Sequence, residues 1–114
     1  MLKFNEGTPI FLRTGTTDMR KEINGLAALV RNEMNLNPFE NGYFVFCNKS
    51  RYLLKILYWD KTGFALWYKR LEKAKFPWPV KETDVRKLTV QQIEWLLDGI
   101  DFFHAHEKLT FSIV

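Results

Sequence analysis

The stretch of residues 49–75 combines cationic and aromatic side chains in a pattern that suits nucleic acid. It holds eight Lys/Arg and two acidic residues, a local net charge of +6. Cations neutralise phosphates, and aromatic faces offer platforms on which unpaired bases stack. The same pattern arises in a hairpin whose aromatics fill the core and whose lysines protect a sheet edge, so both interpretations stay open. The candidate nucleic-acid-binding residues in this stretch are Arg51, Lys55, Trp67, Lys69, Arg70, Lys73 and Lys75.

A further candidate for phosphate contact is Arg20, near the start of the first expected helix. Arg20 and Arg31 are eleven residues apart, which on a helix of 3.6 residues per turn places them within about 20° of each other. Such a row could follow several phosphates. The alternative is a border of the core, with buried aliphatic stems and charged heads in water. We prefer that alternative for Arg31, and Arg20 is the better candidate for binding.

Residues capable of catalysis or metal binding do not converge in the sequence. A metal-dependent strand-transfer site needs two or three carboxylates around paired ions. The histidines at 104 and 106 have no cysteine near them, so a solvated tail is the better interpretation, and Cys47 is interpreted as a small core residue. We therefore expect no catalytic residue, no metal and no cofactor. The candidate carboxylates lie on separate expected elements: Asp18, Asp60, Glu72 and Asp84.

Length and composition favour one folded domain spanning residues 1–114. The chain is 46% hydrophobic and 16% aromatic, with a net charge of +4, and a domain of this size builds one core without disulfides. No apolar run is long enough to span a bilayer, and the polar start leads us to expect no signal peptide. A single cysteine fits a reducing compartment. We expect a cytoplasmic protein that does not enter a membrane.

The expected elements are mainly strands, with two helices. Residues 9–13 predict an opening strand, and residues 43–47, 53–59 and 64–70 predict an antiparallel meander. The turn at residues 60–63 closes a hairpin in which Gly63 could take positive φ. Both faces of the strand at residues 53–59 are apolar, so the pattern does not show which face is exposed.

Each helix has its own start and stop signals. Thr17 or Asp18 could cap the first helix, which ends before Pro38. Thr89 and Gln92 form a capping box for the second, which stops at Gly99. Residues 108–114 alternate like a last strand. The fold class is α+β: a small single domain in which one long and one short helix pack on an antiparallel meander sheet.

Several segments together resemble the small TnpB-type (Orf2-like) accessory proteins of insertion-sequence-66 transposable elements. The resemblance covers roughly residues 7–101, and its order and spacing are specific although each piece alone is weak. One departure is Thr16, where the family usually has proline, and another is a loop at residues 48–54 with fewer arginines than is usual. The matching segments are residues 17–21, 25–30, 44–46, 55–60, 63–64, 67–72, 76, 78–79 and 96–101.

The resemblance implies a role in DNA transposition beside a separate, larger transposase that supplies the catalytic carboxylates. Our first hypothesis is a non-catalytic accessory protein that binds the DNA of element ends without sequence readout, through its basic aromatic hairpin, and assists the transposase. The alternative is an adaptor that binds the transposase without touching DNA. Exposed aromatic surface at Phe76 and Trp78 would then make the contact, together with the acidic last helix. The oligomeric state stays open.

Overall fold

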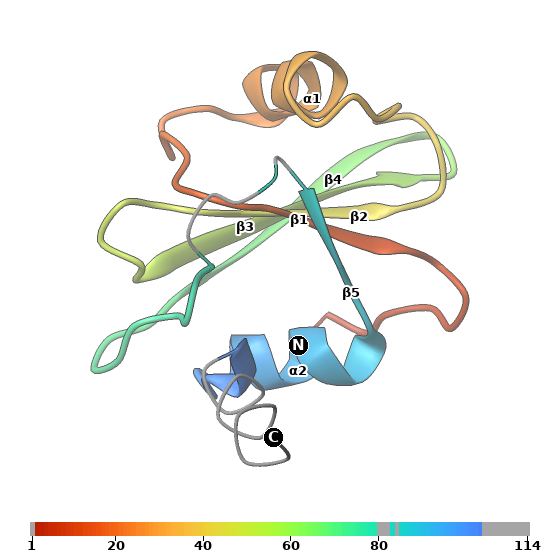
Figure 1. Cartoon of the computed structure of the whole chain (residues 1–114). Helices are drawn as coiled ribbons and strands as arrows, with labels where there is room; N and C mark the ends of the chain where they lie inside the picture. Colours follow the sequence, from red (N-terminus) through yellow and green to blue (C-terminus); the bar gives the residue numbers. More distant parts are fainter. Residues whose placement is uncertain (1, 80–82, 84, 104–114) are drawn as a thin grey trace.

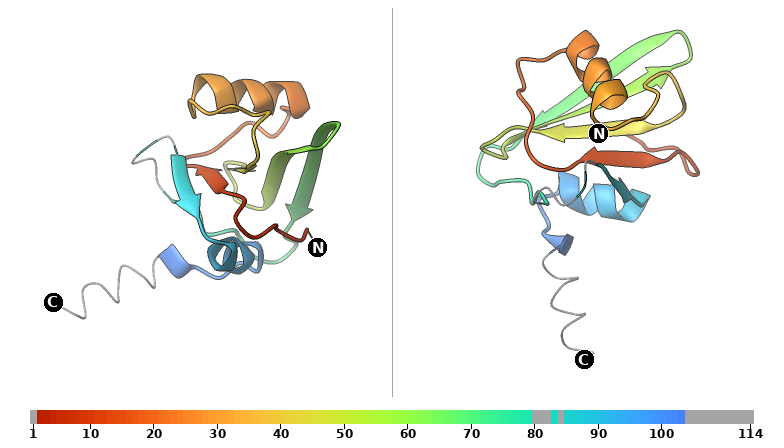
Figure 2. Two further views of the ribbon diagram at one scale, coloured as in Figure 1. Left: turned by 90° about the vertical axis from the view of Figure 1, so that its right-hand side faces the viewer. Right: turned by 45° about the horizontal axis from the view of Figure 1, so that its top comes forward.

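A five-stranded sheet lies between two helices in the computed structural model, which describes residues 2–79, 83 and 85–103. The strand order is β4-β3-β2-β1-β5. Helix α1 covers one face of the sheet and α2 the other (Figures 1 and 2). The elements are β1 (Ile10–Arg13), α1 (Ile23–Asn32), β2 (Tyr43–Cys47), β3 (Leu53–Asp60), β4 (Gly63–Arg70), β5 (Val85–Leu88) and α2 (Val90–Leu97).

The α+β fold class and the meander are confirmed. Strands β2, β3 and β4 are antiparallel neighbours, with Val45 opposite Ile56 and Ile56 opposite Trp67. Strand β1 adds parallel to β2, and α1 lies between them in the chain. Strand β5 pairs antiparallel with β1 and was not predicted. It has only four residues, and its central Arg86 and Lys87 give it no apolar pattern to recognise.

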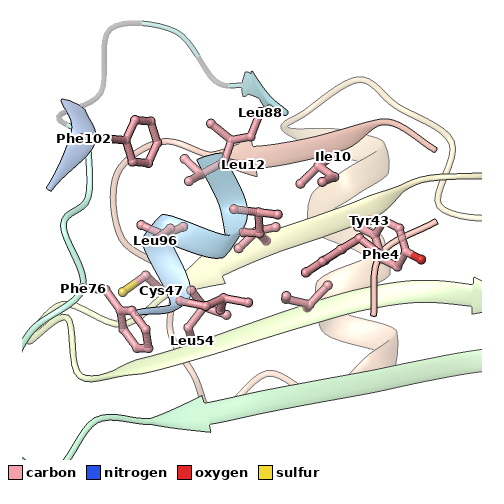
Figure 3. Packing of buried hydrophobic residues seen from close by; sticks show 14 of the residues in the cluster. Phe4, Ile10, Leu12, Tyr43, Cys47, Leu54, Phe76, Leu88, Leu96 and Phe102 are labelled. Atoms are coloured by element: carbon pink, nitrogen blue, oxygen red, sulfur yellow. The ribbon is translucent and has the colours of Figure 1, made fainter. Parts of the chain in front are cut away.

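The two apolar faces of β3 have a simple explanation, because each face is covered by a helix. Leu54 and Ile56 pack with Leu96 of α2, in a core layer that also contains Phe76 (Figure 3). Leu57 faces the other way and packs in the layer beneath α1. Successive side chains of a strand point to opposite faces, so a sheet covered on both sides needs apolar residues in both registers.

The start of α1 differs from the prediction. The helix begins at Ile23, and its N-cap residue Glu22 makes no side-chain capping bond. Asp18 instead accepts a hydrogen bond from the backbone N–H of Arg20, two residues away. A short carboxylate side chain favours such local turns as readily as helix caps. Arg20 therefore lies before the helix, and the predicted row of Arg20 and Arg31 on one helix is wrong.

The signals of α2 are confirmed. The Thr89 hydroxyl accepts from the backbone N–H of Gln92, and the Gln92 side chain accepts from the backbone of Thr89. Gly99 takes a φ of 79° directly after the helix. The predicted strand at residues 108–114 lies outside the described residues. None of the helices among the described residues is long and apolar enough to cross a membrane.

The hairpin between β3 and β4 is confirmed, but its positive φ is at another residue. Lys61 has a φ of 53°, whereas Gly63 is the first residue of β4 and pairs with Asp60. The loop is thus two residues long, and a two-residue hairpin loop is where left-handed backbone is needed. The expectation that Gly63 supplies the positive φ is wrong, because it lies one residue beyond the loop.

Candidate nucleic-acid interface

Three segments far apart in the sequence meet at one end of the sheet. The Thr17 N–H donates to the Cys47 carbonyl at 2.8 Å, which joins the segment before α1 to the end of β2. The Leu71 N–H donates to the Tyr52 carbonyl at 2.8 Å, and the Phe76 N–H to the Arg51 carbonyl at 2.7 Å. The β2–β3 loop therefore lies between the other two segments, at the left of Figure 1. Their cations form what we call the basic end: Arg20, Lys49, Arg51, Arg70, Lys73 and Lys75.

Two shallow depressions follow the basic end. One, of about 790 Å³, is lined by residues of the β2–β3 loop and of the segment after β4, including Tyr52, Arg70, Lys73 and Lys75. The other, of about 440 Å³, is lined by residues 17–20 and 48–50. Ser50 lines both depressions. The surface is therefore continuous from the segment before α1 to the segment after β4.

Most cations of the basic end are free to meet an anion. All six are exposed. Arg70 is paired with Glu72 at 3.0 Å, with both side chains more than half exposed. Within the described part of the chain, no ion pair involves Lys49, Arg51, Lys73 or Lys75. With Asp18 and Glu72 as the acidic neighbours, six positive and two negative charges leave this end with a net +4.

Arg20 is exposed to solvent, but a neighbouring carboxylate offsets part of its charge. Its side chain is 91% exposed, and its Nη2 lies 2.7 Å from Oδ2 of Asp18. Its Nε also donates to that carboxylate. Hydrogen bonds from Arg20 hold the pKa of Asp18 at about 2, below its ordinary value. The carboxylate thus stays ionised and offsets part of the charge of Arg20.

Lys55 is not a surface cation, and the expectation that it contacts phosphates is corrected by its burial. Its side chain is 7% exposed. The Nζ donates to the carbonyls of Met19 and Lys21 at 3.0 and 3.1 Å and lies 3.2 Å from Oε1 of Glu22. A buried ammonium requires such partners. Lys55 therefore fastens the segment before α1 to the sheet.

Lys69 and Trp67 point toward α2, unlike the exposed cations of the basic end. The Lys69 Nζ donates to the Leu97 carbonyl at 2.9 Å, at the C-terminal end of α2, where carbonyls lack helical partners. Trp67 is half-buried and packs on the core layer beneath α2. Each has a structural role that its position in a basic, aromatic stretch did not reveal. For Lys55, Lys69 and Trp67, the structure therefore favours the purely structural interpretation that the sequence left open.

The exposed aromatic surface expected at Phe76 and Trp78 is also wrong. Phe76 is 0% exposed and lies beside Cys47 and Leu54 in the core (Figure 3). Trp78 is half-buried, and its Nε1 donates to the carbonyls of Arg13 and Gly15 at 3.1 and 2.7 Å. The prolines around them exclude a central strand, but they do not prevent the aromatic rings from closing the core.

One exposed aromatic surface lies at the opposite end of the β3–β4 hairpin from the basic end. Phe39 is 51% exposed. Its ring centroid lies 5.4 Å from that of Trp59 and 5.1 Å from that of Phe64. We call these three residues the aromatic tip. Sequence reasoning missed Phe39, because it follows Pro38 in a loop with no periodicity.

Cys47, expected in the core, is 0% exposed, and burial raises the pKa of its thiol to about 12. No group of three or more His, Cys, Asp or Glu side chains among the described residues could hold a metal ion. The two histidines, at positions 104 and 106, lie outside those residues. Of the four candidate carboxylates, Asp18 and Glu72 are paired with arginines, and Asp84 lies outside the described residues.

Comparisons with known proteins agree with the resemblance seen in the sequence. A family model described as IS66 Orf2 like protein matches residues 8–107. The chain is 36% identical over 107 residues to the uncharacterized protein y4hO of Sinorhizobium fredii, covering 94% of this chain and 93% of the relative. It is 31% identical over 108 residues to the uncharacterized protein y4jC of the same organism, covering 95% and 92%. No solved structure matches significantly. The chain therefore belongs to the IS66 Orf2-like family of accessory proteins associated with the transposition of insertion sequences.

Proposed function

We propose that this protein is a non-catalytic accessory factor that binds DNA through the basic end and assists the separate transposase of its element. It would act in the cytoplasm, on element ends and without reading sequence. The observation that supports this most is the meeting of three chain segments that places six exposed cations, with a net charge of +4, at one end. Clustered Lys and Arg side chains on one surface attract the DNA backbone by displacing its counterions.

The cations of the basic end do not contribute equally in this function. Arg51, Arg70, Lys73 and Lys75 make the main phosphate contacts, and Lys49 joins them because it lies in the same β2–β3 loop as Arg51. Arg20 contributes less, since both carboxylate oxygens of Asp18 bind its guanidinium, whereas Glu72 contacts Arg70 through Oε1 alone. Sequence readout is not expected, because reading base edges in the major groove takes a helix or a two-stranded ribbon. The described part of the basic end consists of loop segments and the last residue of β4.

The test is equilibrium binding of the full chain to a DNA duplex at several salt concentrations, with the triple variant Arg70→Ala, Lys73→Ala, Lys75→Ala. Removing one cation that touches a phosphate should lower the salt slope by about one unit, so the triple variant should lower it by about three. A matched control removes three exposed lysines elsewhere: Lys3→Ala, Lys61→Ala and Lys87→Ala. The control has the same net charge as the basic-end variant. Because it retains the cations of the basic end, it should bind DNA far better. Equal reductions of affinity in the two triple variants would contradict a localised interface.

The adaptor hypothesis keeps one specific observation in its favour, the aromatic tip. A large apolar ring that is half exposed and supported by two others is typical of contact surfaces between proteins. Phe39→Ser should then abolish co-purification with the element's transposase while DNA binding is unchanged. If the basic-end variant leaves DNA affinity unaltered and Phe39→Ser abolishes co-purification, the adaptor function is the better one.

A further inference from the structure

Tyr52 is an exposed aromatic residue that lies beside several cations of the basic end. The residue is 42% exposed and lines the depression of about 790 Å³ that is also lined by Arg70, Lys73 and Lys75. Its backbone is held on both sides. The Tyr52 N–H donates to Oδ1 of Asn48 at 3.0 Å, and its carbonyl accepts from Leu71. An exposed ring on a fixed support beside several cations is therefore built into this end.

We propose that this depression takes unpaired nucleotides, with one base stacked on Tyr52 and the adjoining phosphates on Arg70, Lys73 and Lys75. The inference rests on the proposed function and names the form of DNA that the basic end prefers. Aromatic stacking together with backbone cations is how proteins hold single strands without regard to sequence.

Geometry explains why the ligand is unpaired rather than duplex DNA. In a duplex the faces of the bases are covered by their neighbours, so a tyrosine ring at the surface has no base face to meet. Duplex DNA would contact only the cations of this depression. Arg70 lies opposite Leu53 in the β3–β4 register, so it is one residue from Tyr52 across the sheet. One strand could thus contact the ring and the cations together.

The other aromatic residues of the hairpin lack one or other part of this arrangement. Trp67, the stacking candidate from the sequence, is half-buried against the core layer beneath α2. Tyr68 is more exposed, at 63%. It lines a depression with Glu22, Ile23, Asn24, Gly25 and Leu66, a set that contains a carboxylate and no cation. Tyr68 is therefore a matched control, an exposed tyrosine on β4 whose depression contains no cation.

The experiment compares a labelled oligothymidylate of about 12 nucleotides with a duplex of equal length, by fluorescence anisotropy of the full chain. Tyr52→Ala should weaken single-strand binding by about 10-fold, because stacking on one aromatic ring contributes roughly that factor. Duplex binding should change by less than about twofold. Tyr52→Phe keeps the ring and should bind like the unchanged protein, and Tyr68→Ala should bind likewise. The denaturant midpoint of each variant is measured to confirm that it folds.

The outcomes separate this inference from the function on which it rests. If the Arg70, Lys73 and Lys75 triple variant affects neither form of DNA, the proposed function fails and this inference with it. If the triple variant weakens both forms while Tyr52→Ala weakens both equally or neither, the inference alone is overturned. A Tyr52→Ala variant that does not fold is replaced by Tyr52→Leu, and the same selectivity is required of it. A reduction of single-strand binding in Tyr68→Ala as large as in Tyr52→Ala also overturns the inference.

Discussion

The two ends of the β3–β4 hairpin are built from similar residue types but present opposite surfaces. Eight-residue strands separate the ends by roughly 26 Å. At the basic end, aromatic Phe76 is buried and the cations are exposed. At the aromatic tip, Phe39 is exposed on Trp59 and Phe64. A basic, aromatic stretch of sequence thus becomes two distinct surfaces, one suited to an anion and one suited to a protein.

The difference depends on where other segments cover the hairpin. At the basic end the segment after β4 folds back and inserts Phe76 into the core, so its neighbours Lys73 and Lys75 remain outside. The segment before α1 covers Lys55 in the same way and buries it. At the tip, the loop containing Phe39 lies across Trp59 and Phe64 without burying its own ring. Exposure, rather than residue type, therefore distinguishes the two ends.

The largest effect is expected from Phe76→Ala at the basic end. Removing a fully buried phenylalanine eliminates its apolar burial and leaves a cavity, so the free energy of unfolding should fall by about 3–5 kcal/mol. Denaturant unfolding of the variant measures this. A reduction below about 1 kcal/mol would mean that Phe76 is at the surface in solution, which restores it as a docking residue.

A smaller effect is expected from Lys55→Met, which keeps the aliphatic length and removes the ammonium. The carbonyls of Met19 and Lys21 would lose their donor, at a cost of about 1–3 kcal/mol in stability. Lys73→Met is the matched control, and because Lys73 is exposed its stability should be unchanged. In DNA binding the order reverses, with the salt slope reduced by Lys73→Met and retained in Lys55→Met. An unchanged free energy of unfolding in Lys55→Met would contradict the inference that Lys55 fastens the segment before α1 to the sheet.

The smallest effect is expected at the tip. Gly63 has no left-handed φ, and a Cβ added there meets nothing within 4 Å. Gly63→Val should therefore change the free energy of unfolding by less than about 0.5 kcal/mol. Lys61→Gly should instead stabilise the hairpin by about 1 kcal/mol, because Lys61 holds a φ of 53°. Thermal unfolding of both variants tests this. A clear destabilisation in Gly63→Val would mean that Gly63, and not Lys61, holds the left-handed φ.

Much of the architecture was predictable because its signals are local. The capping box of Thr89 and Gln92, the stop at Gly99 and the meander strands depend on residues within a few positions of each other. The resemblance to the accessory family also follows from segments in fixed order. Strand β5 and the start of α1 were missed, because short polar strands and uncapped helix ends are set by tertiary neighbours.

The sequence by itself determined the composition of the candidate site, a basic stretch with interleaved aromatics, and the α+β class that holds it. Only the tertiary structure decided which members of that stretch reach the surface. Lys55 and Lys69 bind backbone carbonyls of segments 34 and 28 residues away, and Phe76 closes the core against Cys47 and Leu54. The physical reason is that burial of a side chain depends on which distant segments pack on it. Neither charge nor spacing along the chain contains that information.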